Sequence, residues 1–142
     1  DGKGVLIAVL DSGIDYRMPD FRKEDGSSRI LAIWDQTIQT GNPPDGLFYG
    51  TEYTREEINR ALAAPNPYEI VESRDEIGHG TSMAAVAAGS RLENGLTYLG
   101  AAPEADIVRR GKPYDDAAAE QICSQSAAAE VILTGFSRIF SV

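Results

Sequence analysis

The sequence predicts an α/β fold, a mainly parallel sheet flanked by helices, and three segments carry that prediction. Residues 5–10, VLIAVL, form a continuous apolar run with β-branched side chains at alternate positions, typical of a strand buried on both faces. A helix with its own capping signal begins near Thr54, and a helix of small residues ends at Gly89. Buried strands that alternate with helices indicate a parallel sheet.

The first strand is followed at once by Asp11, Ser12 and Gly13. Functional groups in open α/β sheets collect at the carboxyl ends of strands, so Asp11 stands where a site is expected. Residues 29–34, RILAIW, predict a second strand. The glycines and the Pro pair in residues 36–50 predict a long surface loop.

The helix near Thr54 has local signals at both ends. Thr54 and Glu57 form a capping box, and Pro65 stops the helix. Ile58 and Leu62 share one face, so we expect a surface helix whose apolar side faces the main body.

The second helix is predicted from Thr81 or Ser82 to Ala88. Almost all of its side chains are small, which lets a helix approach its neighbours closely, so we expect it to be central and buried. Residues 102–108 lead toward a further strand, which Arg109 and Arg110 are expected to interrupt.

The end of the chain offers weaker signals. An Ala-rich helix is predicted over residues 115–129, followed by a short apolar stretch at 131–133. Cys123 is the one cysteine, so no internal disulfide can form, and no Cys/His cluster has zinc spacing.

Composition excludes several function classes. The chain has 142 residues, 42% of them hydrophobic, which suits one globular unit or part of a larger one. Its net charge of -9 argues against a phosphate-binding surface, so nucleic acid is not an expected partner. No apolar run is long enough for a membrane span, and residues 1–4 lack the features of a signal peptide.

His79, the chain's one histidine, lies between Gly78 and Gly80 at a helix entrance, exposed on one side and held on the other as a general base requires. The carboxylate of Asp11 needs a donor if it is buried, and an Asp that orients a His is two-thirds of a nucleophilic triad. Taken singly, His79 also fits a helix-start residue, and Asp11 a turn former before Ser-Gly.

Three strings resemble the subtilisin-like serine protease family. VLIAVLDSGIDYRMPDF resembles its first catalytic motif, with Asp11 as the triad aspartate, and DEIGHGTSMAAVAAG resembles the second, with His79 as the triad histidine. LGAAPEADIV resembles the segment that follows. The insertion over residues 29–73 is most similar to clostridial members, including those associated with spore germination.

The resemblance implies a serine endopeptidase that cleaves peptides and is extracellular or spore-associated. His79 would take a proton from a serine, and Asp11 would hold the imidazole tautomer. Asp75 matches an acidic position that helps line a substrate subsite. Asp20 falls where some members use an aspartate for calcium; no full ligand set can be assembled from the sequence, so we expect no cofactor and a surface carboxylate there.

The nucleophile and the oxyanion asparagine are not identifiable. A Gly-Thr-Ser-Met-Ala string is present at residues 80–84, but Ser82 lies three residues from His79 on the same predicted helix and is interpreted as a helix-start residue. The later serines lack the small-residue context of a nucleophile: Ser124, Ser126, Ser137 and Ser141.

The family likeness stops after Val108. Residues 1–108 are therefore predicted to be the N-terminal part of an incomplete subtilisin-like domain, and residues 109–142 a divergent tail. The chain alone is expected to be inactive, because the remainder of the peptidase domain supplies the missing groups.

Two alternatives remain beside the peptidase. A catalytically dead module of the same fold would bind peptide or a protein partner. Asp11-Ser12-Gly13 also fits an aspartic protease motif, which leaves His79 unexplained and belongs to nearly all-β proteins. A nucleotide-binding Rossmann domain is set aside, since no Gly-rich phosphate loop follows the first strand.

Overall fold

The computed structural model describes residues 1–111, which belong to one compact unit, Asp1–Lys112. The helix predicted over residues 115–129, the apolar stretch at 131–133, Cys123 and the four tail serines lie outside the described residues.

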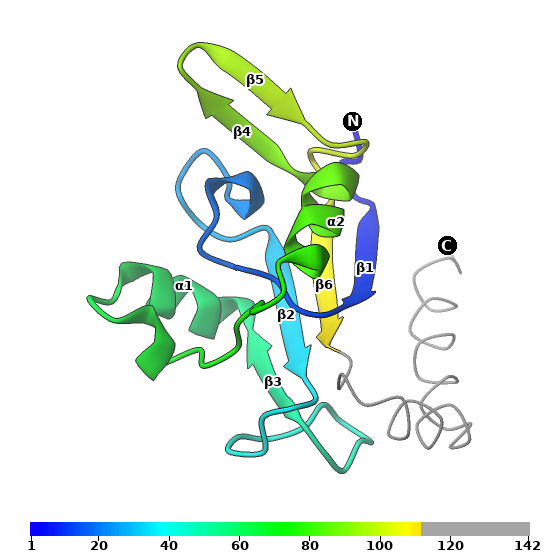
Figure 1. Ribbon diagram of the computed structural model, residues 1–142, viewed down its shortest axis with the longest axis vertical. Coiled ribbons are helices and arrows are strands. Elements are labelled where there is room, and N and C mark those ends of the chain that lie inside the picture. The colour runs from blue at the N-terminus through cyan, green and yellow to red at the C-terminus, as the bar shows by residue number, and fades with distance from the viewer. Residues whose placement is uncertain (112–142) are drawn as a thin grey trace. The chain divides into compact units, whose positions relative to one another are not determined.

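A four-stranded sheet forms the centre of this unit, in the order β1 (Leu6–Asp11), β6 (Asp106–Gly111), β2 (Ile30–Asp35) and β3 (Thr51–Thr54). β1 and β2 both pair with β6 in parallel, whereas β3 pairs with β2 antiparallel. The predicted α/β class with a mainly parallel sheet is confirmed (Figure 1). An all-β aspartic protease does not fit this architecture.

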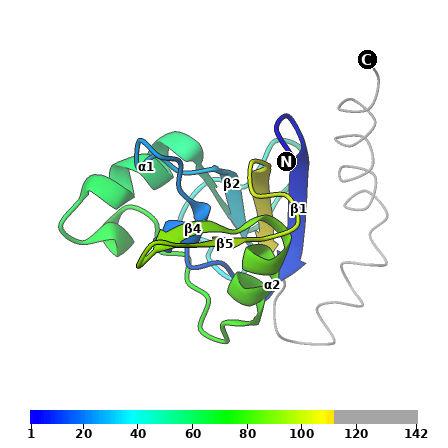
Figure 2. The same cartoon turned by 90° about the horizontal axis from the view of Figure 1, so that it is seen from above.

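Two helices pack on the sheet. α1 (Arg55–Ala63) contacts β2 and β3, and α2 (His79–Ala88) contacts β1 (Figures 1 and 2). Short 3-10 turns, η1 (Pro19–Phe21) and η2 (Pro67–Glu69), lie in the connecting loops.

One apolar cluster joins the sheet to both helices. Burial of this cluster is the main favourable contribution to folding. Its buried members are Val9, Ile14, Tyr16, Phe21, Ile30, Ile33, Tyr53, Ile58, Ala61, Val71, Ala84, Ala88 and Ile107.

The capping box of α1 is present as predicted. The Thr54 side chain accepts from the Glu57 backbone N–H, and the Glu57 carboxylate accepts from the Thr54 N–H. Ile58 and Ala61 face the core, so α1 is the amphipathic surface helix that the sequence predicts.

Two burial predictions are wrong for the described residues. α2 buries one face only, through Gly80, Ala84 and Ala88, while Val86 on the other side is 68% exposed. β1 is an edge strand, and Leu10 is 46% exposed. Small side chains permit the close approach of one helix face, but within residues 1–111 no second layer covers the other.

The prediction that Arg109 and Arg110 interrupt the third parallel strand is also wrong, because β6 continues through both to Gly111. Two features were not predicted. β3 lies between the predicted loop and the predicted helix, and an antiparallel hairpin, β4 (Ser90–Glu93) with β5 (Leu96–Leu99), follows α2. The division at Val108 into a family-like part and a divergent tail stays a prediction.

Candidate active site

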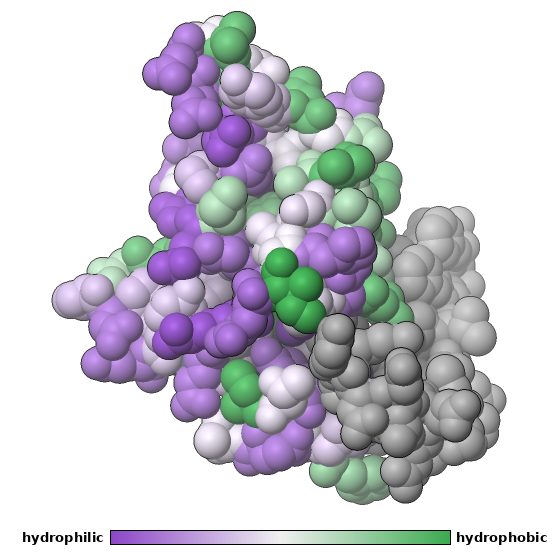
Figure 3. Space-filling view, viewed as in Figure 1, coloured by the Kyte–Doolittle hydropathy of each residue, from purple (hydrophilic) through white to green (hydrophobic). Residues whose placement is uncertain are grey.

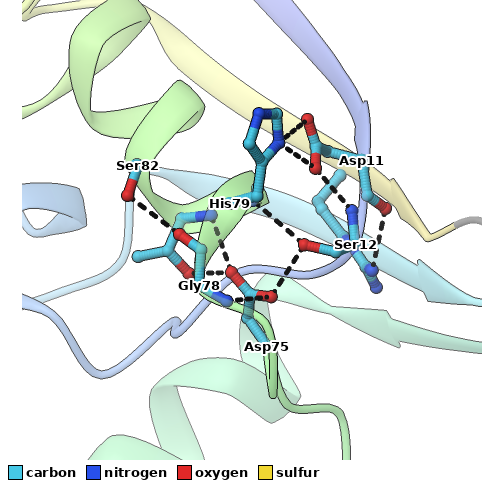
Figure 4. A network of polar contacts seen from close by, with 9 residues as sticks. Asp11, Ser12, Asp75, Gly78, His79 and Ser82 are labelled. Atoms are coloured by element: carbon cyan, nitrogen blue, oxygen red, sulfur yellow. Dashed lines mark hydrogen bonds and ion pairs between the residues drawn. The ribbon is translucent and has the colours of Figure 1, made fainter.

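Asp11 and His79 meet at the carboxyl end of β1 (Figure 4). The imidazole Nδ1 lies 2.8 Å from Asp11 Oδ1 and 2.9 Å from Oδ2. A carboxylate only accepts, so the neutral ring carries its proton on Nδ1 and leaves the lone pair on Nε2. Among the described residues Nε2 has no hydrogen-bond partner, and the His79 side chain is 62% exposed.

Asp11 is held ionised by its neighbours. Partial burial raises the pKa of Asp11, but hydrogen bonds from His79 and from the Ser12 N–H outweigh it, and the net shift is downward. The Asp11 side chain is 18% exposed, whereas the imidazole that it contacts is 62% exposed. The pair therefore presents a fixed carboxylate and a ring nitrogen that is open to solvent.

Two glycines bring the two elements together. A Cβ on Gly80 would overlap the carbonyl of Gly13 and lie 3.1 Å from the Asp11 Cβ. A Cβ on Gly13 would lie 2.5 Å from the Asp75 Cα. The start of α2 thus packs against the turn after β1 backbone to backbone, which only glycine allows.

Asp75, four residues before His79, accepts four hydrogen bonds. Oδ1 accepts from the Ser12 hydroxyl at 2.9 Å and from the Gly78 N–H at 3.0 Å. Oδ2 accepts from the Thr81 N–H at 2.8 Å and from its hydroxyl at 2.6 Å. Burial raises the pKa of Asp75, but these hydrogen bonds outweigh it and lower the pKa to about 2.

A buried arginine lies beneath this end of the sheet. Arg109 on β6 is 1% exposed, with Nη1 3.6 Å from Asp35 Oδ2 and Nη2 donating to the Asp11 carbonyl at 3.4 Å. Asp35 also accepts from the Ser73 hydroxyl at 2.5 Å and the Thr37 hydroxyl at 2.6 Å. Burial raises the pKa of Asp35, and these donors with Arg109 more than reverse the shift.

The sequence interpretation missed Arg109 and Asp35 as partners. An arginine inside an apolar strand is itself a signal, because a charge buried between strands requires a carboxylate on a neighbouring element. The second strand ends in such a carboxylate, Asp35.

Ser82 lies on α2 away from the imidazole (Figure 4). Its hydroxyl donates to the Gly78 carbonyl at 2.8 Å, one turn back along the helix. This is the geometry of a helix-start residue, in keeping with the interpretation of Ser82 from sequence.

Asp20 is buried, so the expectation of a surface carboxylate there is wrong. Its Oδ2 lies 3.8 Å from the guanidinium of Arg91, so the nearest charged partner is a cation. Within residues 1–111 no three carboxylate, His or Cys side chains gather where they could hold a metal ion. The expectation that the chain needs no cofactor stays a prediction.

Other proteins share this arrangement of strands and motifs. Residues 2–130 match the Subtilase family of S8 peptidases, which covers most of the chain. The chain belongs to the subtilase family, a family of serine-type peptidases.

Relatives and a solved structure agree with that assignment. The chain is 33% identical over 123 residues to "Subtilisin-like protease SBT3.17" of Arabidopsis thaliana, covering 75% of this chain and 16% of that protein. It is 31% identical over 129 residues to "Subtilisin-like protease SBT3.1" of the same plant, covering 86% of this chain and 16% of that one. The chain thus spans about a sixth of the length of these relatives.

The described fold is similar to that of the Clostridium perfringens CspB protease. The TM-score is 0.68 at 25% identity, over 91% of this chain and 28% of the clostridial one. The resemblance to clostridial family members that the sequence indicates is thereby confirmed. No helix within residues 1–111 is long and apolar enough to cross a bilayer.

Proposed function

We propose that this chain contributes the aspartate and histidine of a serine endopeptidase whose nucleophilic serine is not among the residues recognised here. The observation that supports it most strongly is the contact of His79 Nδ1 with Asp11, which leaves Nε2 open to solvent. Family membership adds support from outside this geometry.

In this proposal Nε2 of His79 takes the proton from a serine hydroxyl as its oxygen bonds to the peptide carbonyl carbon. Asp11 keeps the proton on Nδ1 and stabilises the imidazolium that forms. The ring then gives its proton to the leaving amine as the peptide C–N bond breaks. Water, deprotonated by the same nitrogen, releases the acyl group and restores the serine.

Substrates, partners and location belong to the same proposal. The substrate is a peptide or protein, and the net charge of -9 favours basic or neutral sequences over acidic ones. Location outside the cell or on a spore and the absence of nucleic-acid partners remain predictions from family likeness and charge.

Inactivity of the isolated chain has a direct test. A fluorophosphonate probe reacts only with an activated serine, and we expect no stoichiometric labelling of the 142-residue chain, because Ser82 donates back into its own helix. Mass spectrometry of the probe-treated protein reads the result. A single modified serine would contradict the predicted inactivity, and modification at Ser82 would also contradict its assignment to a structural role.

The dyad itself is tested through the single histidine. Diethyl pyrocarbonate acylates neutral imidazole, and the absorbance change of the acylated ring reports His79, because the chain has no other histidine. Asp11→Asn removes the charge that stabilises the ring during the reaction, and we expect the rate to fall severalfold. Asp15→Asn is the matched control, because Asp15 pairs with Arg17 and not with His79. Equal acylation rates in the wild type, Asp11→Asn and Asp15→Asn would contradict the proposed pairing of Asp11 with His79.

A catalytically dead binding module is the second candidate. It is favoured by one observation, that no hydroxyl within residues 1–111 donates to Nε2 of His79. Probe labelling of the intact gene product distinguishes the two. Labelling at a serine downstream of residue 142 supports the peptidase, whereas peptide binding without labelling supports the module.

A further inference from the structure

We propose that Asp75 is a positioning residue for the Asp11–His79 pair: it fastens the start of α2 to the turn after β1 and so sets the imidazole against the carboxylate. This inference rests on the proposed function for its significance. Its test measures the geometry of the Asp11–His79 pair and not turnover, so the positioning role and the proposed function can fail separately.

The four hydrogen bonds that Asp75 accepts come from both the start of α2 and the turn after β1. Gly78 and Thr81 flank His79 on either side along the chain, and Asp75 accepts from the backbone of both. Ser12 is the neighbour of Asp11, and its hydroxyl donates to the same carboxylate. One side chain therefore bonds to residues next to each member of the pair.

Ser12 completes the connection. Its oxygen donates to Asp75 and accepts from the Gly80 N–H at 3.0 Å, so the hydroxyl lies between the carboxylate and the first turn of α2 (Figure 4). Thr81 makes a second link, because its hydroxyl donates to Asp75 and accepts from the Asp15 N–H at 2.9 Å. Both hydroxyls bridge the helix start and the turn after β1.

α2 has no cap of its own. Gly78 occupies the N-cap position with φ +81° and offers no side chain, so the first-turn N–H groups depend on acceptors from elsewhere. Asp75 supplies one for Thr81, and Ser12 supplies one for Gly80. A carboxylate at this end also interacts favourably with the helix dipole.

The same bonds argue against the expected substrate-subsite role. Each oxygen of Asp75 already accepts two donors, and a substrate cation would have to displace them. Asp75 thus acts through Asp11 and His79.

The test uses the full 142-residue chain labelled with ¹⁵N, in which His79 supplies the only imidazole signals. At about pH 8 a ring held as the Nδ1–H tautomer gives two well-separated nitrogen shifts, pyrrole-type for Nδ1 and pyridine-type for Nε2. Asp75→Asn places N–H donors where two acceptor sites are needed. We expect the two shifts to converge, since the ring then exchanges between tautomers.

Two reference variants bracket the result. Asp15→Asn makes the same chemical change in the turn after β1, where the carboxylate pairs with Arg17, and should leave both shifts in place. Asp11→Asn should make the shifts converge or exchange between the two nitrogens, because an amide NH₂ that donates to Nδ1 favours the Nε2–H tautomer. If it does not, the Asp11–His79 contact and the proposed function fail. If Asp11→Asn behaves as expected while folded Asp75→Asn keeps wild-type shifts, only the positioning role is overturned.

Thr81 provides a milder pair of variants in case Asp75→Asn does not fold. Thr81→Val removes the hydroxyl that joins Asp75 to the Asp15 N–H, whereas Thr81→Ser keeps it. We expect partial convergence of the His79 shifts in Thr81→Val and wild-type shifts in Thr81→Ser. A merely structural role would lower the urea midpoint of Thr81→Val without moving the shifts, and that outcome overturns the proposal.

Discussion

The candidate site at the carboxyl end of β1, called the site end below, and the β4–β5 hairpin are stabilised by different kinds of contact. At the site end, two glycines allow backbone contact and the Asp75 carboxylate accepts four hydrogen bonds. Beyond its ladder, the hairpin contacts η1 and α2 and pairs Arg91 with Asp20, but its apolar side chains face solvent: Leu92 is 74% exposed and Leu99 61% exposed. In Figures 1 and 3 it extends away from the helices, with apolar patches on its surface.

The difference teaches where precision is required. A proton-transfer pair depends on hydrogen bonds between elements that are distant in sequence, so the site end needs specific atoms at specific places. A two-stranded hairpin is only marginally stable by itself, so this one depends on its turn, its ladder and its contacts with η1 and α2, none of which has to place a reacting atom. Substitutions at the two regions should therefore differ in their cost.

The largest expected effect is at Asp35. Asp35→Asn removes the charge that faces Arg109, which is 1% exposed and cannot reach water. Removing one partner of a buried ion pair typically costs about 3–5 kcal/mol. Urea unfolding followed by circular dichroism measures the free energy of unfolding.

The matched control for Asp35→Asn lies on the hairpin. Glu93→Ala breaks an exposed pair with Arg91, 3.3 Å long, and should cost less than about 1 kcal/mol. Equal costs for the two variants would mean that Arg109 is solvated in solution, which would undo the contrast between the two regions.

The next effect compares two glycines. Gly80→Ala directs a methyl group into the backbone of Gly13, which cannot move without shifting the turn after β1, and we expect a loss of about 2–3 kcal/mol. Gly95→Ala meets no atom within 4 Å, but φ there is +77°, so conformational strain alone should cost about 1 kcal/mol.

The same unfolding assay measures both glycine variants. The His79 nitrogen shifts supply a second reading, since only Gly80→Ala moves the start of α2 away from Asp11. A smaller loss for Gly80→Ala than for Gly95→Ala would show that the start of α2 can move back without cost.

The contrast also explains what the sequence could predict. α1 was found correctly because its signals are local: Thr54 and Glu57 cap each other three residues apart. α2 begins at His79, earlier than predicted, because its first turn is capped from elsewhere by Ser12 and Asp75. Such contacts depend on tertiary structure, which no local pattern encodes.

Asp11 and His79 were predicted because their motifs and the strand-end rule both point to them. Arg109 was misread as a strand breaker, since its partner Asp35 lies on another strand. The hairpin was missed although the sequence carries a clear signal for it. Asn94-Gly95 is a typical hairpin turn, and these two residues occupy the turn with φ of +51° and +77°.

Acid should lower the free energy of unfolding through the carboxylates of the site end. The pKa values of Asp11, Asp35 and Asp75 are all lowered in the folded chain. Their contribution to stability is therefore complete above the unfolded pKa near 3.8 and is lost as the pH falls toward the folded pKa, which is about 2 for Asp75. Allowing for solvent screening, the part due to Asp75 is about 1 kcal/mol.

The acid effect is measured by unfolding in urea at about pH 6 and about pH 2.5. Asp75→Asn should be less stable than wild type at the higher pH and closer to it at the lower one. A constant difference between the two proteins would mean that Asp75 has the same pKa folded and unfolded, and the hydrogen bonds assigned to it would not hold in solution.

The smallest expected effect is on the hairpin. Leu92→Ser replaces an apolar side chain that is 74% exposed and lies opposite Thr97, so little buried area is lost and the free energy of unfolding should change by less than about 0.5 kcal/mol. Ile33→Ser, in the core and 0% exposed, should cost several times more in the same assay, because it removes packing and buries a hydroxyl. A loss above about 1 kcal/mol for Leu92→Ser would mean that the hairpin packs against something in solution. The hairpin would then need specific contacts as the site end does, and the contrast between the regions would disappear.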